Sequence, residues 1–245
     1  MPIYDKPVRL LFRDMLNDIG LADGDLLTRD AVYKWFHDRY PKIKDGTIAA
    51  HLIRMSINAP SRPYYGATAE DDLLFQIDSQ QYRRYNAATD PRPIYVKPEP
   101  DPDGRDGEDQ EDGEASNAFA YERDLQNYLA QNLHLVEPGL QLYEDEGITG
   151  LEFPAGNRRI DILALDTHRN FVVIELKVSR GHDRTVGQLL RYIAWIRLNQ
   201  AESNQEVRGI IIAREISDDL RLACSEVPSV GLYEYELSVL VKRVK

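Results

Sequence analysis

The chain has 245 residues, 42% of them hydrophobic and 29% charged, which is the composition of a globular protein with room for two modest domains or one large one. No apolar run is long enough to cross a membrane, and residues 1–10 lack the apolar stretch of a signal peptide. The single cysteine excludes an intramolecular disulfide and a cysteine-based zinc site. We therefore expect a cytoplasmic protein without a membrane partner.

The net charge of -11 is concentrated in one short segment. Residues 99–114 contain 9 acidic side chains and 1 basic one, interspersed with Pro and Gly and without any apolar residue. Such a segment cannot bury enough surface to offset the entropy of ordering it, so residues 98–115 are predicted to form an acidic disordered linker. This linker divides the chain into two domains, residues 1–97 and residues 116–245.

The first domain contains three segments with apolar residues at helical spacing, followed by two segments in which apolar and polar residues alternate. The predicted helices span residues 7–19, 29–41 and 46–58, with Thr28 and Asp45 as the caps of the second and third. The predicted hairpin joins residues 73–78 to residues 81–85. Three short helices followed by a hairpin are typical of a winged helix-turn-helix, in which the third helix reads DNA.

The third helix and the hairpin carry the side chains that we expect to contact DNA. They are His51, Arg54, Asn58, Arg62, Arg83 and Arg84. Arginine and asparagine suit base edges and phosphates. In TIAAHLIRMSIN and in the pair DLLFQI and YRRY, the domain also resembles small winged-helix modules fused to restriction-type proteins, which implies DNA binding. The alternatives are a protein-docking module and, for the arginine pair, an ordinary solvated surface.

The second domain begins with a predicted helix over residues 117–133, capped by Ser116. Glu122 lies on the same stripe of this helix as the apolar Phe119 and Leu125. A carboxylate that faces a protein interior needs a partner such as a metal ion or a cation. The alternative is a glutamate at the margin of the stripe that reaches solvent.

Two predicted strands, residues 157–166 and 168–179, are apolar enough to be central in a sheet and yet contain charges. Alternation places Glu175 and Lys177 on one face, and pairing of the strands as a hairpin would set Asp161 beside Glu175. Two buried carboxylates repel each other unless a cation lies between them. Mg²⁺, for which Mn²⁺ can substitute, fits because it takes one or two carboxylates and keeps several waters. Such a metal can activate water for attack on a phosphate, while Lys177 orients that water or stabilises the developing charge.

The pattern Asp161…Glu175-Leu-Lys177 resembles the PD-(D/E)xK nuclease superfamily, and a predicted helix over residues 183–199 follows it. The segments NRRIDILALD, VVIELKVSRG and GQLLRY resemble the nuclease domain of the NucS/EndoMS mismatch endonucleases. This resemblance covers residues 116–245 and implies a restriction-endonuclease-like α/β fold with a mixed sheet flanked by helices.

The resemblance also implies roles for individual residues. The implied catalytic set is Asp161, Glu175, Lys177 and Glu122, supported by Gln188 and Tyr192. The implied metal ligands are Asp161, Glu175 and Glu122. The resemblance does not extend to residues 1–98, where NucS-type proteins carry a β-rich dimerisation domain, so specificity for mismatches is not implied.

Each of these assignments has a structural alternative. The charged set on the strands could be an ion pair, although this would leave one carboxylate without a partner. Gln188 and Tyr192 share a helix face and could be ordinary amphipathic surface. Arg180 and Arg184 precede or begin that helix and are expected to contact phosphate, with a solvated loop as the alternative.

The remaining sequence predicts a buried strand at residues 206–215, a helix capped by Ser217 and a last strand at residues 230–244. Cys224 shares helical spacing with apolar residues and is expected in the core. Left at a sheet edge, the long apolar last strand would pair with another chain, which favours a homodimer held by the nuclease domains. Its coverage within its own domain is the alternative.

These patterns together favour a Mg²⁺-dependent DNA endonuclease that is recruited by a winged helix and acts in restriction, defence or repair. The alternative is a non-catalytic DNA-binding or assembly protein on a nuclease fold. The complete set of Asp161, Glu175 and Lys177 speaks against that alternative, because a platform would not need all three.

Overall fold

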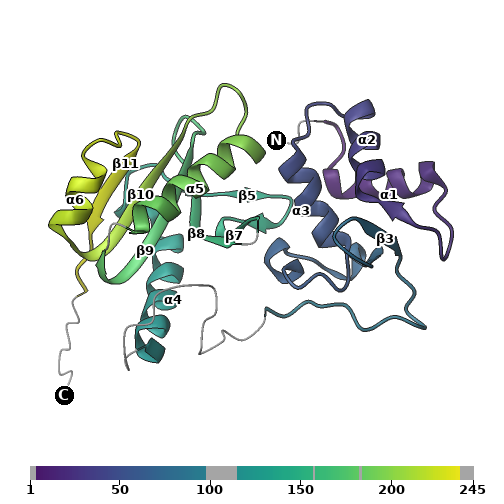
Figure 1. Ribbon diagram of the computed structural model, residues 1–245, viewed down its shortest axis with the longest axis horizontal. Coiled ribbons are helices and arrows are strands. Elements are labelled where there is room, and N and C mark those ends of the chain that lie inside the picture. The colour runs from purple at the N-terminus through teal and green to yellow at the C-terminus, as the bar shows by residue number, and fades with distance from the viewer. Residues whose placement is uncertain (1–3, 98–114, 157, 182–183, 238–245) are drawn as a thin grey trace, which may run out of the picture.

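The computed structural model describes residues 4–97, 115–156, 158–181 and 184–237, and for residues 115–121, 178–181 and 184 it describes the backbone alone. Two α/β halves lie side by side, the N-terminal half on the right of Figure 1 and the C-terminal half on the left. The predicted acidic linker lies outside the described residues, except for Ala115, which begins a helix.

The N-terminal half has the three predicted helices and the predicted hairpin, together with a short strand that the sequence did not indicate. The helices are α1 (Val8–Ile19), α2 (Arg29–Arg39) and α3 (Asp45–Met55), and the strands are β1 (Leu27–Thr28), β2 (Leu74–Gln76) and β3 (Gln81–Arg84). The strands form an antiparallel sheet in the order β1-β3-β2. Thr28 caps α2 as expected by accepting a hydrogen bond from the Ala31 amide, whereas Asp45 lies inside α3 and Lys44 takes the cap position.

The C-terminal half is a mixed sheet covered by helices, which confirms the expected α/β class. Its sheet has the order β11-β10-β9-β8-β4, with β7 also pairing with β8. The strands are β4 (Gln141–Leu142), β7 (Leu151–Ala155), β8 (Arg158–Leu165), β9 (Phe171–Gly181), β10 (Val207–Ile216) and β11 (Val230–Glu234). Strand β8 runs antiparallel to β9, and β9, β10 and β11 run parallel to one another, because helices α5 (Arg184–Asn199) and α6 (Asp218–Cys224) connect them.

The helices cover opposite faces of this sheet. Leu125 and Leu129 of α4 (Ala115–Gln131) share an apolar cluster with Ile174 of β9. Buried residues of α5, such as Leu189, share another cluster with Val173, the neighbour of Ile174 on the same strand. Neighbouring strand residues thus point to opposite faces, as the alternation predicts. Among the described helices, none is both long and apolar enough to cross a membrane.

The last strand of the C-terminal half differs from the sequence expectation, whereas the helix before it agrees. Strand β11 ends at Glu234, so it is shorter than the strand predicted for residues 230–244, of which residues 238–244 lie outside the described part. Ser217 caps α6 by accepting a hydrogen bond from the Leu220 amide, as predicted. Cys224 is buried in the core, also as predicted.

The two halves pack against each other, which is not what a loosely tethered domain would do. Ala50 of α3 and Tyr65 of the 3-10 helix η1 (Arg62–Tyr65) belong to the same buried apolar cluster as Ile148 and Phe153 of the C-terminal half. The short hairpin of β5 (Glu144–Asp145) and β6 (Ile148–Thr149) projects toward α1 and α3. Because apolar burial is shared across the boundary, we expect the halves to unfold together.

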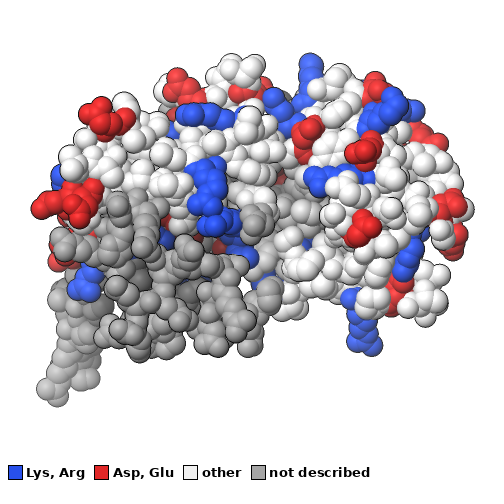
Figure 2. All heavy atoms as spheres, in the orientation of Figure 1, with Lys and Arg blue, Asp and Glu red and all other residues white. Residues whose placement is uncertain are grey.

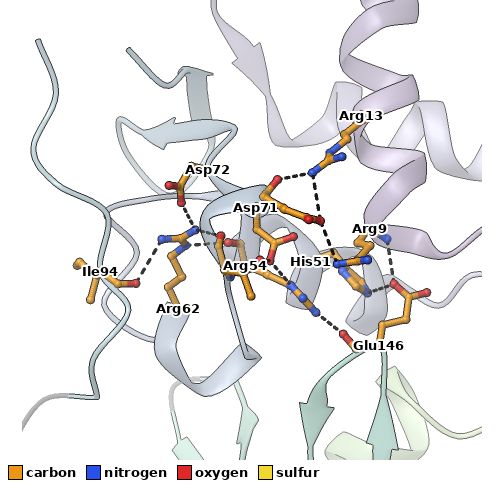
Figure 3. A network of polar contacts seen from close by, with 11 residues as sticks. Arg9, Arg13, His51, Arg54, Arg62, Asp71, Asp72, Ile94 and Glu146 are labelled. Atoms are coloured by element: carbon orange, nitrogen blue, oxygen red, sulfur yellow. Dashed lines mark hydrogen bonds and ion pairs between the residues drawn. The ribbon is translucent and has the colours of Figure 1, made fainter. Parts of the chain in front are cut away.

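Glu146, in the turn of the β5–β6 hairpin, is the main polar link between the halves (Figure 3). Its two carboxylate oxygens accept hydrogen bonds from the amides of Val8, at 2.6 Å, and Arg9, at 3.0 Å. These are orphan donors at the start of α1, where a carboxylate also meets the positive end of the helix dipole. The Glu146 carbonyl accepts a further hydrogen bond from Arg54 of α3. The C-terminal half thus supplies the cap that α1 lacks in its own sequence.

Replacing Gly46 by alanine tests this packing. A methyl group at Gly46, in the first turn of α3, would lie 2.5 Å from the carbonyl oxygen of Asn199 at the end of α5. Glycine to alanine in a helix ordinarily stabilises a protein by about 0.5–1 kcal/mol, but here we expect a lower thermal unfolding temperature because the two backbones must separate. Gly187→Ala in α5 is the matched control, since its methyl group would meet nothing within 4 Å. Equal stabilisation by both variants would show that α3 does not pack on α5.

Candidate active site

Strands β8 and β9 bring the three predicted site residues together. The strands pair antiparallel with Ile162 opposite Ile174 as the last pair, and Asp161 and Glu175 are the next residues of the two strands beyond it. An Oδ2 atom of Asp161 accepts a hydrogen bond from the Leu176 amide at 2.7 Å. The Nζ atom of Lys177 lies 3.2 Å from Oε1 of Glu175. Strand periodicity and a short turn suffice to produce this arrangement.

The electrostatics of this cluster are those of charges held out of water. Burial raises the pKa of Asp161, and burial together with the Asp161 charge raises the pKa of Glu175 well above its usual range. Burial alone would lower the pKa of Lys177, but the neighbouring carboxylates outweigh it and raise that pKa. Glu175 is 1% exposed, and its Oε2 atom has no hydrogen-bond partner among the described residues. An orphaned buried carboxylate oxygen beside a second carboxylate suits a divalent cation bound by oxygen.

Helix α4 places Glu122 next to this cluster without completing a set of three metal ligands. Burial raises the pKa of Glu122 to about 7, with a further contribution from the charge of Asp161. No group of three His, Cys, Asp or Glu side chains within the described part of the chain is arranged to hold a metal ion. The role of Glu122 as a third ligand stays a prediction. Asp161 and Glu175 alone would suffice for Mg²⁺, which keeps several waters.

The structure places Gln188 and Tyr192 on the side of α5 that faces the site. Tyr192 is 3% exposed, and its hydroxyl accepts a hydrogen bond from Gln188 Nε2 at 3.3 Å. Burial raises the pKa of Tyr192, and the charge of Glu175 adds to that shift. Because Tyr192 is buried and its pKa is raised in part by the charge of Glu175, it is not ordinary amphipathic surface, which was the alternative.

Sequence reasoning missed three residues around the site. Gln126 of α4 donates a hydrogen bond of 2.7 Å to the carbonyl of Asp161, and it lies one helical turn after Glu122, a spacing that could have indicated it. Arg158 and Arg159 are exposed at the start of β8. The charge of Arg158 partly offsets the rise in the pKa of Tyr192, and the charge of Arg159 does the same for Asp161. Strand alternation could have indicated Arg159, two residues before Asp161.

The expected DNA-contacting face of α3 is turned inward, so this prediction is wrong. His51 and Arg62 are 0% exposed and Arg54 is 3% exposed (Figure 3). Arg54 pairs with Asp71 at 3.0 Å, and Arg62 donates to the carbonyl of Arg54 at 2.8 Å. The physical reason is that the polar face of α3 meets the β5–β6 hairpin and its own domain's loops, which satisfy these groups instead of solvent.

His51 is buried at this interface beside Glu146 and Arg54. Its Nε2 atom lies 3.5 Å from the Glu146 carboxylate, and neither ring nitrogen has a hydrogen-bond partner among the described residues. Burial, reinforced by the positive charge of Arg54, lowers the pKa of His51 to about 3. The side chain is therefore neutral at physiological pH and contributes packing to the interface.

The other residues expected to bind DNA are engaged within the N-terminal half or lie outside the described side chains. Asn58 exchanges two hydrogen bonds of 2.8 Å with the backbone of Gln76. Arg83 holds Asp90 in a bidentate pair at 2.7 and 2.6 Å, and Arg84 donates to the carbonyl of Leu21. These contacts stabilise the hairpin, so its arginines are not the free surface groups that the sequence suggested. The other two arginines that were expected to contact DNA are Arg180 and Arg184, whose side chains the structure does not describe.

The sequence of the C-terminal half matches a known nuclease domain. Residues 121–227 match the family model described as the endonuclease NucS C-terminal domain. The expected resemblance to NucS-type endonucleases is therefore confirmed for this part of the chain. Residues 7–84 match a domain of unknown function (DUF7669), which assigns no activity to the N-terminal half.

Among the relatives are proteins named endonuclease NucS. The chain is 31% identical over 103 residues to endonuclease NucS of Methanopyrus kandleri, a match that covers 42% of this chain and 36% of the relative. It is 30% identical over 131 residues to endonuclease NucS 2 of Halobacterium salinarum, covering 53% of this chain and 48% of the relative. The chain thus spans less than half the length of these two relatives. The crystal structure of a repair endonuclease from Pyrococcus abyssi is 25% identical, with a TM-score of 0.38 and coverage of 53% and 50%.

Proposed function

We propose that this protein is a metal-dependent DNA endonuclease that hydrolyses phosphodiester bonds. The observation that carries the proposal is the buried cluster of Asp161, Glu175 and Lys177, in which one carboxylate oxygen has no hydrogen-bond partner in the described part of the chain. The likeness of residues 121–227 to the NucS C-terminal domain supports the same class of reaction. Bound between Asp161 and Glu175, Mg²⁺ or Mn²⁺ would activate water and neutralise charge on the phosphate.

Each side chain of the cluster has a task that its position supports. Asp161 and Glu175 would hold the cation, and the Leu176 amide keeps the Asp161 carboxylate in place. Lys177 stays protonated beside Glu175 and can stabilise the negative charge that develops on the phosphate. Gln188 and Tyr192 border the site and would orient the substrate or water, and Gln126 fixes the backbone of Asp161.

Recruitment to DNA by the N-terminal half is part of the proposal in an altered form. The element order α1-β1-α2-α3-β2-β3 supports a winged-helix architecture for this half. Its third helix is packed against the nuclease half, so DNA would meet another of its surfaces. A homodimer held by the nuclease half remains a proposal, since a double-strand break requires two such sites.

Metal dependence is the direct test of the activity. Purified protein should cleave at least one of a panel of labelled DNAs (unmodified duplex, mismatched duplex, branched and single-stranded) when Mg²⁺ or Mn²⁺ is added. Excess EDTA should abolish cleavage, and renewed Mg²⁺ should restore it, because the proposed cation would lower the pKa of the attacking water and stabilise charge on the phosphate. The substrate that is cleaved separates restriction, defence and repair. Binding without cleavage under every metal would support the non-catalytic alternative, and cleavage that persists in EDTA would exclude the metal mechanism.

A further inference from the structure

The N-terminal half contributes an aromatic ring and a lysine to the border of the candidate active site. Tyr64 of η1 is 9% exposed, and two cations lie over its ring. Lys97, the last described residue before the acidic segment, has its Nζ atom 4.8 Å from the ring centroid. The Arg159 guanidinium of β8 lies 4.9 Å from the same centroid. One ring thus brings together cations from both halves, a cation–π arrangement.

This junction lies beside the reaction centre. Arg159 is two residues before Asp161 on β8, and its charge partly offsets the rise in pKa that burial causes in that carboxyl group. Glu152 of β7 pairs with Lys97, and its negative charge raises the pKa of Asp161. Figure 2 shows Lys and Arg side chains gathered over the region where β7, β8 and α5 lie in Figure 1. Arg159 is thus an exposed cation on the same strand as Asp161, where phosphates that flank the cleaved bond would lie.

Both cations of the junction reach the surface. Lys97 pairs with Glu152, and Arg159 is exposed on β8. Arg158, exposed at the start of the same strand, adds a further positive charge on the side of Tyr192. The Lys97 side chain is 43% exposed, so it can bind a second anion or exchange Glu152 for one. Exposed cations held on a buried ring suit a phosphate backbone, which needs positioned charge and carries no sequence information.

We propose that Lys97 and Arg159, held in place by Tyr64, bind the DNA backbone phosphates next to the cleaved bond. The N-terminal half then completes the substrate-binding surface of the nuclease instead of serving as a separate recognition domain. This assignment rests on the proposed endonuclease activity. It also gives the packing of the two halves a function, since the position of Lys97 relative to Asp161 depends on that packing.

The test compares Lys97→Ala, Arg159→Ala and the double variant with wild-type protein. On the DNA that the wild type cleaves best, each single variant should raise KM about tenfold and change kcat less than about twofold, because a charge-assisted contact to the bound substrate is lost. Lys97→Arg and Arg159→Lys should restore most of the affinity. Lys34→Ala, which removes an exposed lysine of α2, is the control and should leave KM unchanged.

A second measurement separates phosphate binding from a merely structural role. In the Asp161→Asn background, which should bind DNA without cutting it, the slope of log affinity against log salt should fall by about 0.9 for each alanine variant. An unchanged slope and KM, with or without a lower unfolding temperature, would overturn the inference and leave the junction as structural packing. If the wild type cleaves no DNA in any metal, the proposed function itself fails. If the wild type cleaves DNA and the variants behave like the wild type, only the proposed phosphate-binding site is refuted.

Discussion

Asp161→Asn should abolish DNA cleavage while leaving the protein folded. Several kcal/mol of charge stabilisation depends on the metal, so we expect the cleavage rate to fall about a thousandfold or more. The asparagine oxygen can still accept the hydrogen bond from the Leu176 amide, so the local geometry is retained. Because the buried Asp161 charge raises the pKa of Glu175, a neutral amide at 161 also relieves repulsion. The thermal unfolding temperature without metal should therefore equal or exceed that of the wild type.

Single-turnover cleavage and thermal unfolding of the same preparation measure both effects. Glu175→Gln should behave like Asp161→Asn, since each removes one of the two carboxylates that would hold the cation. Glu226→Gln removes an exposed carboxylate from the same half and should have no effect on either measurement. Calorimetry should show Mn²⁺ binding to the wild type and to Glu226→Gln, and none to the other two. Wild-type cleavage by Asp161→Asn would refute the mechanism.

Arg54→Ala should be among the most destabilising single substitutions in this chain. Arg54 and Asp71 are 3% and 1% exposed, and their pairing lies at the boundary between the two halves. Removing the guanidinium leaves Asp71 buried without its counter-charge and leaves the Glu146 carbonyl without its donor. Breaking a buried ion pair by removing one partner costs about 3–5 kcal/mol. Urea unfolding monitored by tryptophan fluorescence should show a loss of this size in the free energy of unfolding.

Two further variants show where the loss originates. Arg54→Met combined with Asp71→Asn removes both charges and should be less destabilised than Arg54→Ala, because no unpaired charge stays buried. Lys34→Ala removes an exposed partner of Asp38 and should leave the unfolding midpoint unchanged. If Arg54→Ala proved as stable as Lys34→Ala, the two halves would be loosely tethered in solution. The polar face of α3 would then be available to DNA, as the sequence had suggested.

The packing of the two halves also changes how the DNA-binding proposal is tested. A triple variant of Arg54, Arg83 and Arg84 would remove internal contacts of the N-terminal half and lower its stability. A loss of DNA affinity in that variant could then reflect unfolding. Lys97 and Arg159 are better probes, because both are exposed and lie next to the candidate site.

The catalytic candidates could be found from the sequence alone because they follow from local rules. The alternation of side chains along a strand put Glu175 and Lys177 on one face, and a short turn between two apolar strands put Asp161 beside Glu175. Helical spacing and capping residues likewise predicted α1, α2, α5 and α6. In each case the interacting residues are close in sequence, so the pattern already contains the geometry.

Only the tertiary structure decided which polar residues face solvent. Helical periodicity separates a polar face of α3 from an apolar one, but it does not show whether that polar face meets water or another part of the chain. Arg54 donates to Asp71, which is 17 residues away in the sequence, and to the Glu146 carbonyl, which is 92 residues away. Lys97 pairs with Glu152, which is 55 residues away. Such pairings depend on how the two halves dock, which no local pattern records. The buried interface and the cations at the edge of the candidate site therefore emerged only when distant segments were placed in contact, because a charged side chain is stable inside a protein only where the fold supplies its partner.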